Sequence, residues 1–311
     1  MTREVGREIE CDPRSVITTG TFDGVHLGHQ AIIHYLVERA GDGGVPTVVT
    51  FDPHPREVLL GQPIPLLTTL GERADALEAL GVQRFVVVPF SRDLSLLEPE
   101  DYVRDVLVET VGMREIVIGY DHRFGRKARG DRAMLEALGP VLGFSVDVIP
   151  EQIEDDVTVS STEVRRLLLE DGDATRAAHL LGRPYRITGT VVRGDQRGRT
   201  IGYPTANVRP GDARKLVPKR GVYAVRVRSA DLEAGGMMNV GHRPTFETDG
   251  ATTVEVHLFD LEADLYGRTL EVDVIARLRD EQRFDGVDAL VAQLDDDAAA
   301  ARSAIEDAAS T

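Results

Sequence analysis

Short apolar runs alternate with helix-like patterns through the first half of the chain. The apolar runs predict strands at residues 15–19, 47–51, 84–89, 115–119 and 144–149. Apolar positions at helical spacing predict helices over residues 27–40, 69–80, 99–111 and 132–142. The run at 85–88 is apolar at every position, as expected for a strand covered by helices on both faces. This alternation predicts a doubly wound, Rossmann-like parallel sheet, which binds ligands beyond the carboxyl ends of its strands.

The second half has a different pattern, in which strands follow one another without intervening helices. Two helical stretches, 162–170 and 174–181, come first, and the pattern changes at Gly182. Strands are then predicted at 185–193, 222–229, 237–240, 252–260 and 269–278, and a final helix at about 287–308. Gly and Pro separate the strands, which is typical of a small antiparallel β-barrel. We therefore expect two domains, 1–182 and 183–311, in a chain of 311 residues.

Composition narrows the classes of function. The formal net charge of −16 would repel phosphate backbones, so we expect no nucleic-acid partner. No apolar run is long enough to span a membrane, and the charged first residues lack the apolar segment of a secretory signal. Cys11 is the only cysteine, which excludes an internal disulfide and a cysteine-based zinc cluster and fits a reducing cytoplasm. Adaptation to high salt and compositional bias both remain open as reasons for the many Asp and few Lys residues.

A glycine-rich segment, GTFDGVHLGH at residues 20–29, joins the first predicted strand to the first predicted helix. Glycines let backbone N–H groups approach a ligand, and a helix N-terminus favours phosphate. His26 and His29 are three residues apart, so they share a face and can donate hydrogen bonds to a polyphosphate. The alternative is a glycine-rich turn with two core or solvent histidines. A zinc site lacks a third ligand at metal spacing, although the sequence leaves Asp23 open.

A second segment, GDQRGRTIGYPTAN at residues 194–207, follows the first strand of the second half. Gly198 and Gly202 would let backbone amides approach phosphate. Thr205 and Asn207 project the same way from an extended chain, and their neutral oxygens suit a Mg²⁺ that carries ATP phosphates. The alternative is a Gly/Pro loop between strands.

The alternation of residues 253–259 along a predicted strand indicates one candidate catalytic carboxylate. It places Thr253, Glu255, His257 and Phe259 on one face and the intervening aliphatic residues on the other, core face. Glu255 is then either a catalytic carboxylate or a solvent-facing strand residue.

The motifs together resemble a known family. The string GTFDGVHLGHQ resembles the HxGH nucleotidyltransferases and, more closely, the bacterial bifunctional riboflavin kinase/FAD synthetases. The segments TFDPHPREVL (50–59), VIGYDHRFGRKARGD (117–131), VSSTEVRRLL (159–168) and the PTAN string follow in family order. The resemblance spans essentially the whole chain. It implies that the first half adenylylates FMN to FAD and the second half phosphorylates riboflavin to FMN, with ATP and Mg²⁺ in both steps.

The resemblance also implies roles for individual residues. The ATP site of the adenylyltransferase would comprise Gly20, Phe22, Asp23, His26, His29, Ser160, Ser161, Thr162 and Arg165, with His26, His29 and Arg165 acting on the phosphates. Its flavin site would comprise Asp121 and Phe124. The ATP site of the kinase would comprise Gly198, Arg199, Gly202, Thr205 and Asn207, of which Thr205 and Asn207 hold the metal; Glu255 would be the catalytic base, and Arg279 and Phe284 would border the flavin.

Two departures and two alternatives accompany this interpretation. His122 stands where the family usually has Phe, and Leu261 stands where it usually has Phe after the Asp. The first departure concerns the geometry of the flavin side, whereas the second concerns packing. The first alternative is an enzyme that retains only one of the two activities because the other site has decayed, and against it both motif sets are whole. A nucleotidyltransferase for another phosphate-bearing substrate is the other alternative, against which the PTAN half argues. The sequence leaves the oligomeric state open.

Overall fold

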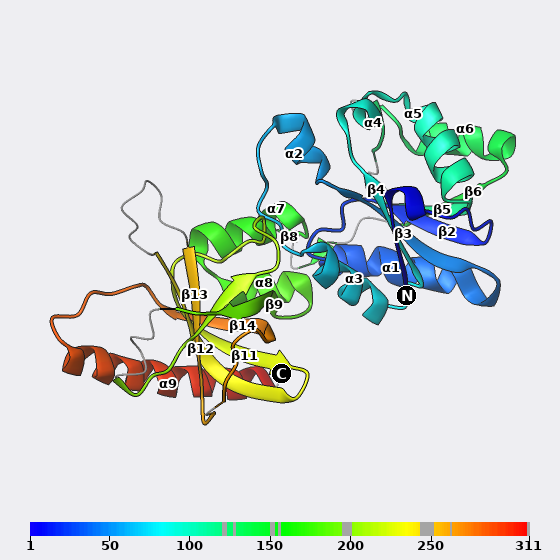
Figure 1. Ribbon diagram of the computed structural model, residues 1–311. Coiled ribbons are helices and arrows are strands. Elements are labelled where there is room, and N and C mark those ends of the chain that lie inside the picture. The colour runs from blue at the N-terminus through cyan, green and yellow to red at the C-terminus, as the bar shows by residue number, and fades with distance from the viewer. Residues whose placement is uncertain are drawn as a thin grey trace. The chain divides into compact units, whose positions relative to one another are not determined.

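The computed structural model describes residues 1–119, 123–126, 129–149, 153–154, 157–194, 201–242, 252–261 and 263–309. The chain divides into two compact units (Figure 1). Unit 1 comprises Met1–Ile64 and Leu70–Ser160, and unit 2 comprises Pro65–Thr69 and Ser161–Thr311. The functional boundary between residues 182 and 183 stays a prediction.

Unit 1 is built on a six-stranded parallel sheet with the order β1-β4-β3-β2-β5-β6. Its strands are β1 (Thr2–Val5), β2 (Ser15–Thr19), β3 (Val45–Asp52), β4 (Arg84–Pro89), β5 (Met113–Gly119) and β6 (Ser145–Ile149). Its helices are α1 (Leu27–Ala40), α2 (Pro55–Leu60), α3 (Leu70–Ala79), α4 (Arg92–Leu96), α5 (Pro99–Asp101), the π-helix η3 (Tyr102–Thr110) and α6 (Arg132–Leu142). The predicted doubly wound α/β fold is confirmed.

Two hydrophobic clusters cover the two faces of this sheet. One joins α1 and α3 to the sheet and contains Ile33, Leu36 and Leu77. The other joins η3 and α6 to the opposite face and contains Leu107 and Leu135. All five side chains are at most 1% exposed, so each face is a closed core. Figure 1 shows α1 and α3 on one side of the sheet and α6 on the other.

Unit 2 is a closed antiparallel barrel with the strand order β10-β13-β12-β11-β14-β9. Its strands are β9 (Tyr185–Val192), β10 (Ala206–Pro210), β11 (Gly221–Ser229), β12 (Leu232–His242), β13 (Thr252–Leu258) and β14 (Thr269–Arg279). Its helices are α7 (Ser161–Arg166), the π-helix η5 (Leu167–Asp171), α8 (Ala174–Leu181) and α9 (Val287–Ala309). The predicted small barrel with a terminal helix is confirmed.

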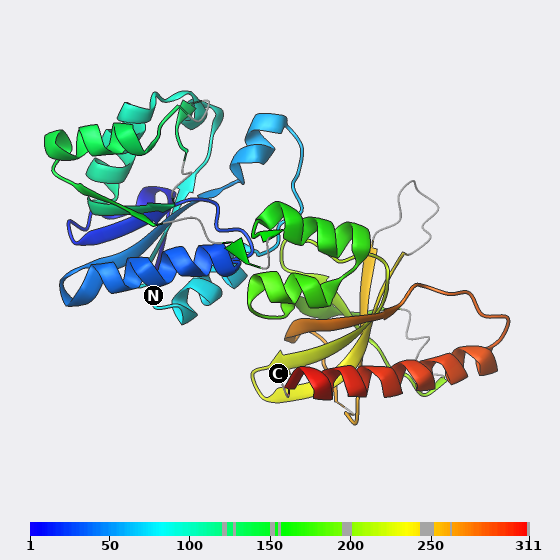
Figure 2. The ribbon, with the colours of Figure 1, turned by 180° about the vertical axis from the view of Figure 1, so that it is seen from behind.

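The terminal helix α9 lies along the outside of the barrel (Figure 2). A cluster that contains Val222, Met237 and Ile275 from the strands, and Phe259 just after β13, meets Ala301 of the helix. The side chain of Ala301 is fully buried, and the other four are at most 8% exposed. This apolar contact fixes the helix on the barrel.

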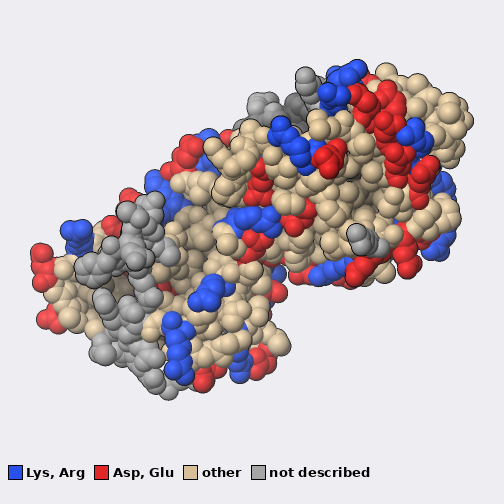
Figure 3. Space-filling view, turned by 45° about the horizontal axis from the view of Figure 1, so that its top comes forward, with Lys and Arg blue, Asp and Glu red and all other residues tan. Residues whose placement is uncertain are grey.

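Basic and acidic side chains are interspersed on the face drawn in Figure 3, in spite of the net charge of −16. On the described surface many such side chains form ion pairs, and Arg132 Nε with Glu136 Oε1 at 2.6 Å is one example. Exposed pairs of this kind contribute at most about 1 kcal/mol each. They leave the surface locally mixed in charge, while the net charge stays acidic.

Candidate active sites

The first motif occupies the point of the parallel sheet at which the strand order reverses. The connections from β2 to β3 and β4 extend the sheet on one side of β2, whereas β5 returns to its other side. Residues 20–26 follow the carboxyl end of β2 and lead into α1. Open α/β sheets bind ligands at this crevice, so the fold places the motif where a nucleotide site is expected.

The backbone of this loop has an unusual conformation. Phe22 and Val25 have positive φ angles of 47° and 44°, and Gly24 between them has 89°. Such angles are costly for a β-branched residue, and the surroundings must hold it there. Val25 is fully buried, its N–H donates to the Phe22 carbonyl at 3.1 Å, and its carbonyl accepts from Gln30 Nε2 at 2.9 Å. The loop is therefore held in one conformation before any ligand arrives.

The two histidines of the motif lie side by side at the start of α1. His26 is the N-cap residue, and its Nδ1 accepts a hydrogen bond from the backbone N–H of His29 at 3.4 Å. The two rings stack, with centroids 3.7 Å apart and an interplanar angle of 19°. Because Nδ1 of His26 accepts, the proton of the neutral ring lies on Nε2, which can donate to an anion. A Cβ on Gly28 would lie 3.3 Å from the His26 ring, so this position favours glycine.

A buried ion pair, which no sequence pattern predicted, joins the loop to α3. Arg73 of α3 and Asp23 of the loop are 3% and 0% exposed in their side chains, and their Nη2 and Oδ1 atoms are 3.4 Å apart. Arg73 Nη1 also donates to Thr50 Oγ1 at 3.3 Å, and Thr50 Oγ1 donates to the carbonyl of Thr21 at 3.1 Å. Asp23 therefore contacts the protein core, where it holds the loop.

Gly20 and Phe124 are also placed by the structure. The N–H of Gly20 donates to the Val49 carbonyl at 3.1 Å, and a Cβ there would lie 3.2 Å from the Phe22 ring. Phe124 packs against the η3–α6 core, with its ring 6.1 Å from that of Tyr102. Asp121 and the departure at His122 lie outside the described residues.

The second part of the predicted triphosphate site begins α7. Ser160 ends unit 1, whereas Ser161, Thr162 and Arg165 belong to unit 2. Arg165 Nε donates to the carbonyl of Pro65 at 2.8 Å. This contact joins α7 to the segment Pro65–Thr69, which also belongs to unit 2. Lys215 Nζ donates a hydrogen bond to the Leu67 carbonyl of the same segment at 2.6 Å.

The barrel places the residues of the second predicted site on neighbouring strands. Asn207 of β10 is paired directly with Glu255 of β13, and Glu255 is paired in turn with Asn239 of β12. Directly paired residues of antiparallel strands have side chains on the same face, so these three form one row. Thr205 lies two residues before Asn207, just outside β10. The sequence indicated Asn207 and Glu255 separately but gave no indication of Asn239.

The predicted alternation along β13 is confirmed by burial. Val254, Val256 and Leu258 are buried inside the barrel, whereas Glu255 and His257 are half-exposed on the outer face. The Glu255 carboxylate is thus within reach of a ligand on the outside of the barrel while its strand neighbours hold the strand in place.

Glycines make room for this row. A Cβ on Gly194 would clash with the carboxamide of Asn207, so Gly194 permits the side chain to lie where it does. Gly202 has a φ of 85°, which favours glycine in the turn before Thr205. Gly198 and Arg199, which were predicted to contact ATP, lie outside the described residues.

Further polar groups and a pocket adjoin the row. A Cβ on Gly241 would lie 2.9 Å from Glu281 Oε1, 3.0 Å from Asn239 Nδ2 and 3.5 Å from Thr253 Oγ1, so these groups gather at one place. Beside them is a pocket of ≈600 Å³, a volume in the range of small-molecule sites. It is lined by Leu169, Val217, Pro218, Lys219, Arg220, Thr252, Asp280 and Glu281.

Arg279 and Phe284, which were predicted to border the flavin, have partners on the helix side. Arg279 Nη2 forms an ion pair with Asp297 of α9 at 2.6 Å, and its guanidinium lies 5.8 Å from the Phe284 ring. The Asp297 side chain is 4% exposed, so this ion pair is largely buried. The structure thus gives Arg279 a role in fastening α9 to β14.

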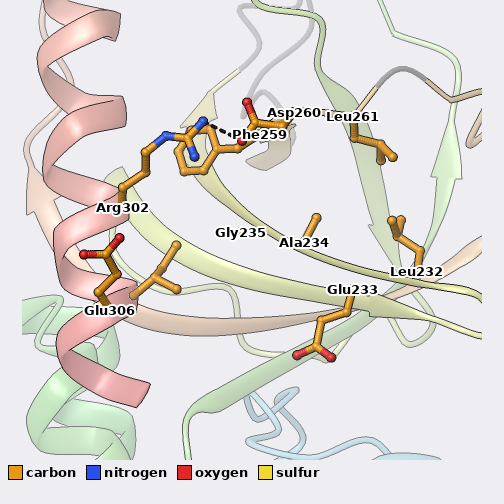
Figure 4. Close-up of a pocket in the computed structure, with 10 residues that line it drawn as sticks. Leu232, Glu233, Ala234, Gly235, Phe259, Asp260, Leu261, Arg302 and Glu306 are labelled. Carbon is orange, nitrogen blue, oxygen red and sulfur yellow. Dashed lines mark ion pairs between the residues drawn. The ribbon is translucent and has the colours of Figure 1, made fainter. Parts of the chain in front are cut away.

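A second pocket, of ≈410 Å³, lies between α9 and the ends of β12 and β13 (Figure 4). Arg302 of α9 lies over the Phe259 ring at 4.3 Å and forms an ion pair with Asp260 at 2.9 Å, drawn as a dashed line in Figure 4. The residues that line it, Leu232–Gly235, Phe259–Leu261, Arg302, Ile305 and Glu306, include none of the predicted site residues.

The donor set at the second site fits a metal that arrives with its nucleotide. Among the residues that the structure describes, no three His, Cys, Asp or Glu side chains are grouped as metal ligands. Thr205 and Asn207 instead offer a hydroxyl and a carboxamide oxygen, which are hard neutral ligands. Mg²⁺ commonly keeps several waters and binds through one or two protein groups plus substrate phosphates, which agrees with this pair.

The fold and the two sites define a two-domain enzyme of nucleotide chemistry, with an HxGH loop on a parallel sheet and a PTAN segment on a barrel. A family model described as FAD synthetase matches residues 8–163, and one described as riboflavin kinase matches residues 181–305. The chain belongs to the bifunctional riboflavin kinase/FMN adenylyltransferase family, and the resemblance in its motifs is confirmed.

Curated members of this family are similar along almost their whole length. The protein of Pseudomonas fluorescens is 41% identical over 93% of this chain and 92% of its own. Those of Listeria monocytogenes and Escherichia coli K12 are each 39% identical over 92% of this chain and 91% of their own. All three are described as bifunctional riboflavin kinase/FMN adenylyltransferase.

A solved structure shares the fold. A protein from Streptococcus pneumoniae, described as a macrolide-efflux protein, is 31% identical and has a TM-score of 0.84. The match covers 96% of this chain and 97% of that one. In the described part of the present chain, no helix has both the length and the apolar character needed to cross a membrane.

Proposed function

We propose that this chain makes both flavin cofactors from riboflavin. Residues 183–311 convert riboflavin and ATP to FMN and ADP, and residues 1–182 convert FMN and ATP to FAD and pyrophosphate. The observation that carries this proposal is that the two motifs lie at two separately built places, one at the switch point of the sheet and one beside Glu255 on the barrel. The functional boundary at 182/183 is part of the proposal.

The kinase reaction needs a base and a positioned nucleotide. Glu255 accepts the proton of the riboflavin 5′-hydroxyl as that oxygen attacks the γ-phosphorus of ATP, and ADP leaves in line. Thr205 and Asn207 hold the Mg²⁺, which neutralises charge on the phosphates. Asn207 is paired directly with Glu255, so nucleotide and base are brought together by one pair of strands. Gly198, Arg199 and Gly202 complete the phosphate loop.

The flavin ring of the kinase substrate is assigned to the pocket of ≈600 Å³ that includes Thr252 and Glu281. Thr252 lies three residues before Glu255 on the same strand. The apolar side chains of Leu169, Val217 and Pro218 offer a surface for the ring, and Lys219 and Arg220 offer donors to its carbonyl oxygens.

The adenylylation reaction needs charge neutralisation more than a base, because the FMN phosphate is already an anion. One of its oxygens attacks the α-phosphorus of ATP. The bond from the α-phosphorus to the bridging oxygen breaks, and pyrophosphate leaves with that electron pair. His26 Nε2 and His29 donate hydrogen bonds to the phosphates as charge develops. Gly20, Phe22 and Asp23 shape the loop around them. Ser160, Ser161, Thr162 and Arg165 bind the triphosphate, and Asp121 and Phe124 border the flavin.

ATP is the co-substrate of both reactions, so we place the enzyme in the cytoplasm, with riboflavin, FMN, FAD and ATP as its small-molecule partners. The test is product analysis of the purified chain with ATP and Mg²⁺. We expect riboflavin to give FMN and then FAD, and supplied FMN to give FAD. A reaction that stops at FMN would show that only the kinase activity is present. A chain that converts neither riboflavin nor FMN would refute the proposal.

A further inference from the structure

The turn that carries Thr205 is held from outside by two side chains of other elements. Residues 203–207, here called the PTAN turn, lead from the glycine-rich segment into β10. The Nδ1 atom of His257, on β13, lies 2.8 Å from the carbonyl oxygen of Pro204. The hydroxyl of Tyr203 donates to a carboxylate oxygen of Asp295, on α9. The rings of Tyr203 and His257 also contact each other, with centroids 5.0 Å apart.

The His257 contact fixes the one backbone angle that proline leaves soft. The pyrrolidine ring fixes φ of Pro204, and a hydrogen bond to its carbonyl fixes ψ. The peptide bond that follows is planar, so its plane and the start of Thr205 are set as well. Since the carbonyl can only accept, Nδ1 of His257 must carry the proton, as it does in the Nδ1–H tautomer and in the imidazolium.

The Tyr203 contact connects the same turn to a helix that is itself fixed. Burial, with a further contribution from the hydrogen bond to Asp295, raises the pKa of Tyr203 to about 12, so its hydroxyl stays protonated as a donor. The helix is anchored two residues further on, where Asp297 accepts from Arg279 of β14 and from Gln293. Asp295 is thus presented to the turn from a stable position.

His257 lies two residues after the predicted base on the same face of β13, so one strand holds both the base and the turn that faces it. We infer that His257 is a positioning residue of the kinase, which together with Asp295 of α9 holds the PTAN turn so that Thr205 and Asn207 meet the nucleotide beside Glu255. The inference rests on the proposed kinase function. It gives the terminal helix a part in nucleotide binding beyond its packing on the barrel.

Two amides of different length test the geometry. The Nδ2 of asparagine takes nearly the place of imidazole Nδ1, whereas the amide of glutamine lies one bond further out. We expect His257→Gln to lower kcat/KM for ATP in riboflavin phosphorylation about tenfold or more, mostly through KM, since small misplacements of reacting groups are costly. His257→Asn should stay within about threefold of the parent, because its donor remains in place.

Adenylylation of supplied FMN serves as the control within each molecule, because its predicted site has no residue in β13 or the PTAN turn. Tyr203→Phe is the second variant: it keeps the ring and removes the bond to Asp295. We expect it to raise KM for ATP in the kinase reaction about three- to fivefold, as for one lost hydrogen bond, and to leave adenylylation unchanged.

Two results would overturn the inference. If His257→Gln phosphorylates riboflavin as the parent does, the contact with Pro204 does not hold the turn. If the Asn and Gln variants lose activity equally and unfold at equally lowered temperatures, the residue supports the barrel and has no positioning role. Failure of the proposed function is distinguishable from both, because the parent protein itself would then leave riboflavin unphosphorylated.

Discussion

The two segments that we propose to bind phosphate are built in opposite ways. In unit 1, the segment with the two histidines is one loop of consecutive residues, and the loop's own positive φ angles at Phe22 and Val25 define its shape. In unit 2, Asn207, Glu255 and Asn239 come from three strands, and the register of the barrel brings them together. A change in the first site should therefore act locally, whereas the second site depends on contacts between distant parts of the sequence.

The largest effect is expected from removing the carboxylate of the barrel site. Glu255→Gln keeps the size and polarity of the side chain but cannot accept the riboflavin proton, so FMN formation should fall about 10²- to 10⁴-fold. Initial rates of FMN formation at saturating ATP measure this. Adenylylation of supplied FMN should be unchanged.

The control for this variant is Glu233→Gln, which alters a strand carboxylate of the same barrel that lines the pocket beside α9. We expect it to phosphorylate riboflavin at the parent rate. Equal activity of the two variants would remove Glu255 from the chemistry.

The converse change acts on the loop site. His29→Ala removes a donor to the ATP phosphates, so FAD formation from FMN should fall about 10²- to 10³-fold while riboflavin phosphorylation continues. Pyrophosphate release reports the rate. His34→Ala changes an exposed histidine of the same helix and should have no effect; adenylylation that survives in His29→Ala would contradict the assignment.

A smaller effect is expected from removing the buried arginine that supports the loop, because this change acts on the stability of unit 1. Arg73→Met leaves the carboxylate of Asp23 buried without this partner, which should lower the free energy of unfolding of unit 1 by about 3–5 kcal/mol. Denaturant unfolding monitored separately for the two units would measure this decrease.

The double variant Arg73→Met, Asp23→Leu should recover part of the lost free energy of unfolding. A loss of stability confined to the barrel would contradict this account.

The smallest expected effect concerns the pH dependence of the stability of unit 1, through Glu4 of its edge strand β1. Hydrogen bonds from Arg84 hold the pKa of Glu4 below its ordinary value of 4.5. A lowered pKa in the folded state adds stability above pH 4.5, and this stability is lost as the pH falls through the folded pKa. Glu4→Gln should flatten that acid decline in thermal unfolding between pH 7 and about 3. An unchanged decline would show that other carboxylates cause it.

Local patterns were sufficient to predict most of the architecture. Residues 85–88 of β4 are all apolar, which predicted a strand buried on both faces, whereas β13 alternates, which predicted a strand buried on one face. Strand β1 escaped prediction because its residues, TREV, are mostly polar. It is an edge strand, fixed by pairing with β4 and by the ion pair of Glu4 with the buried Arg84. The helix predicted over 99–111 begins at Pro99 but is a π-helix from Tyr102 to Thr110.

The sites were predictable only as far as their residues are close in sequence. The loop 20–29 could be recognised because strand, glycines, histidines and helix follow one another. Arg73 could not, because it is 50 residues from Asp23 and meets it only through the packing of α3. The pairing of Asn207 with Glu255 likewise follows from the closure of the barrel, which no local pattern specifies.

The most direct measurement of two separate active sites is a mixing experiment with Glu255→Gln and His29→Ala. Each variant alone, given riboflavin, ATP and Mg²⁺, should yield little or no FAD, because one lacks FMN and the other cannot adenylylate it. Mixed in equal amounts, they should restore FAD formation through FMN released by His29→Ala. If each variant instead lost both reactions and the mixture made no FAD, the two sites would not be separate.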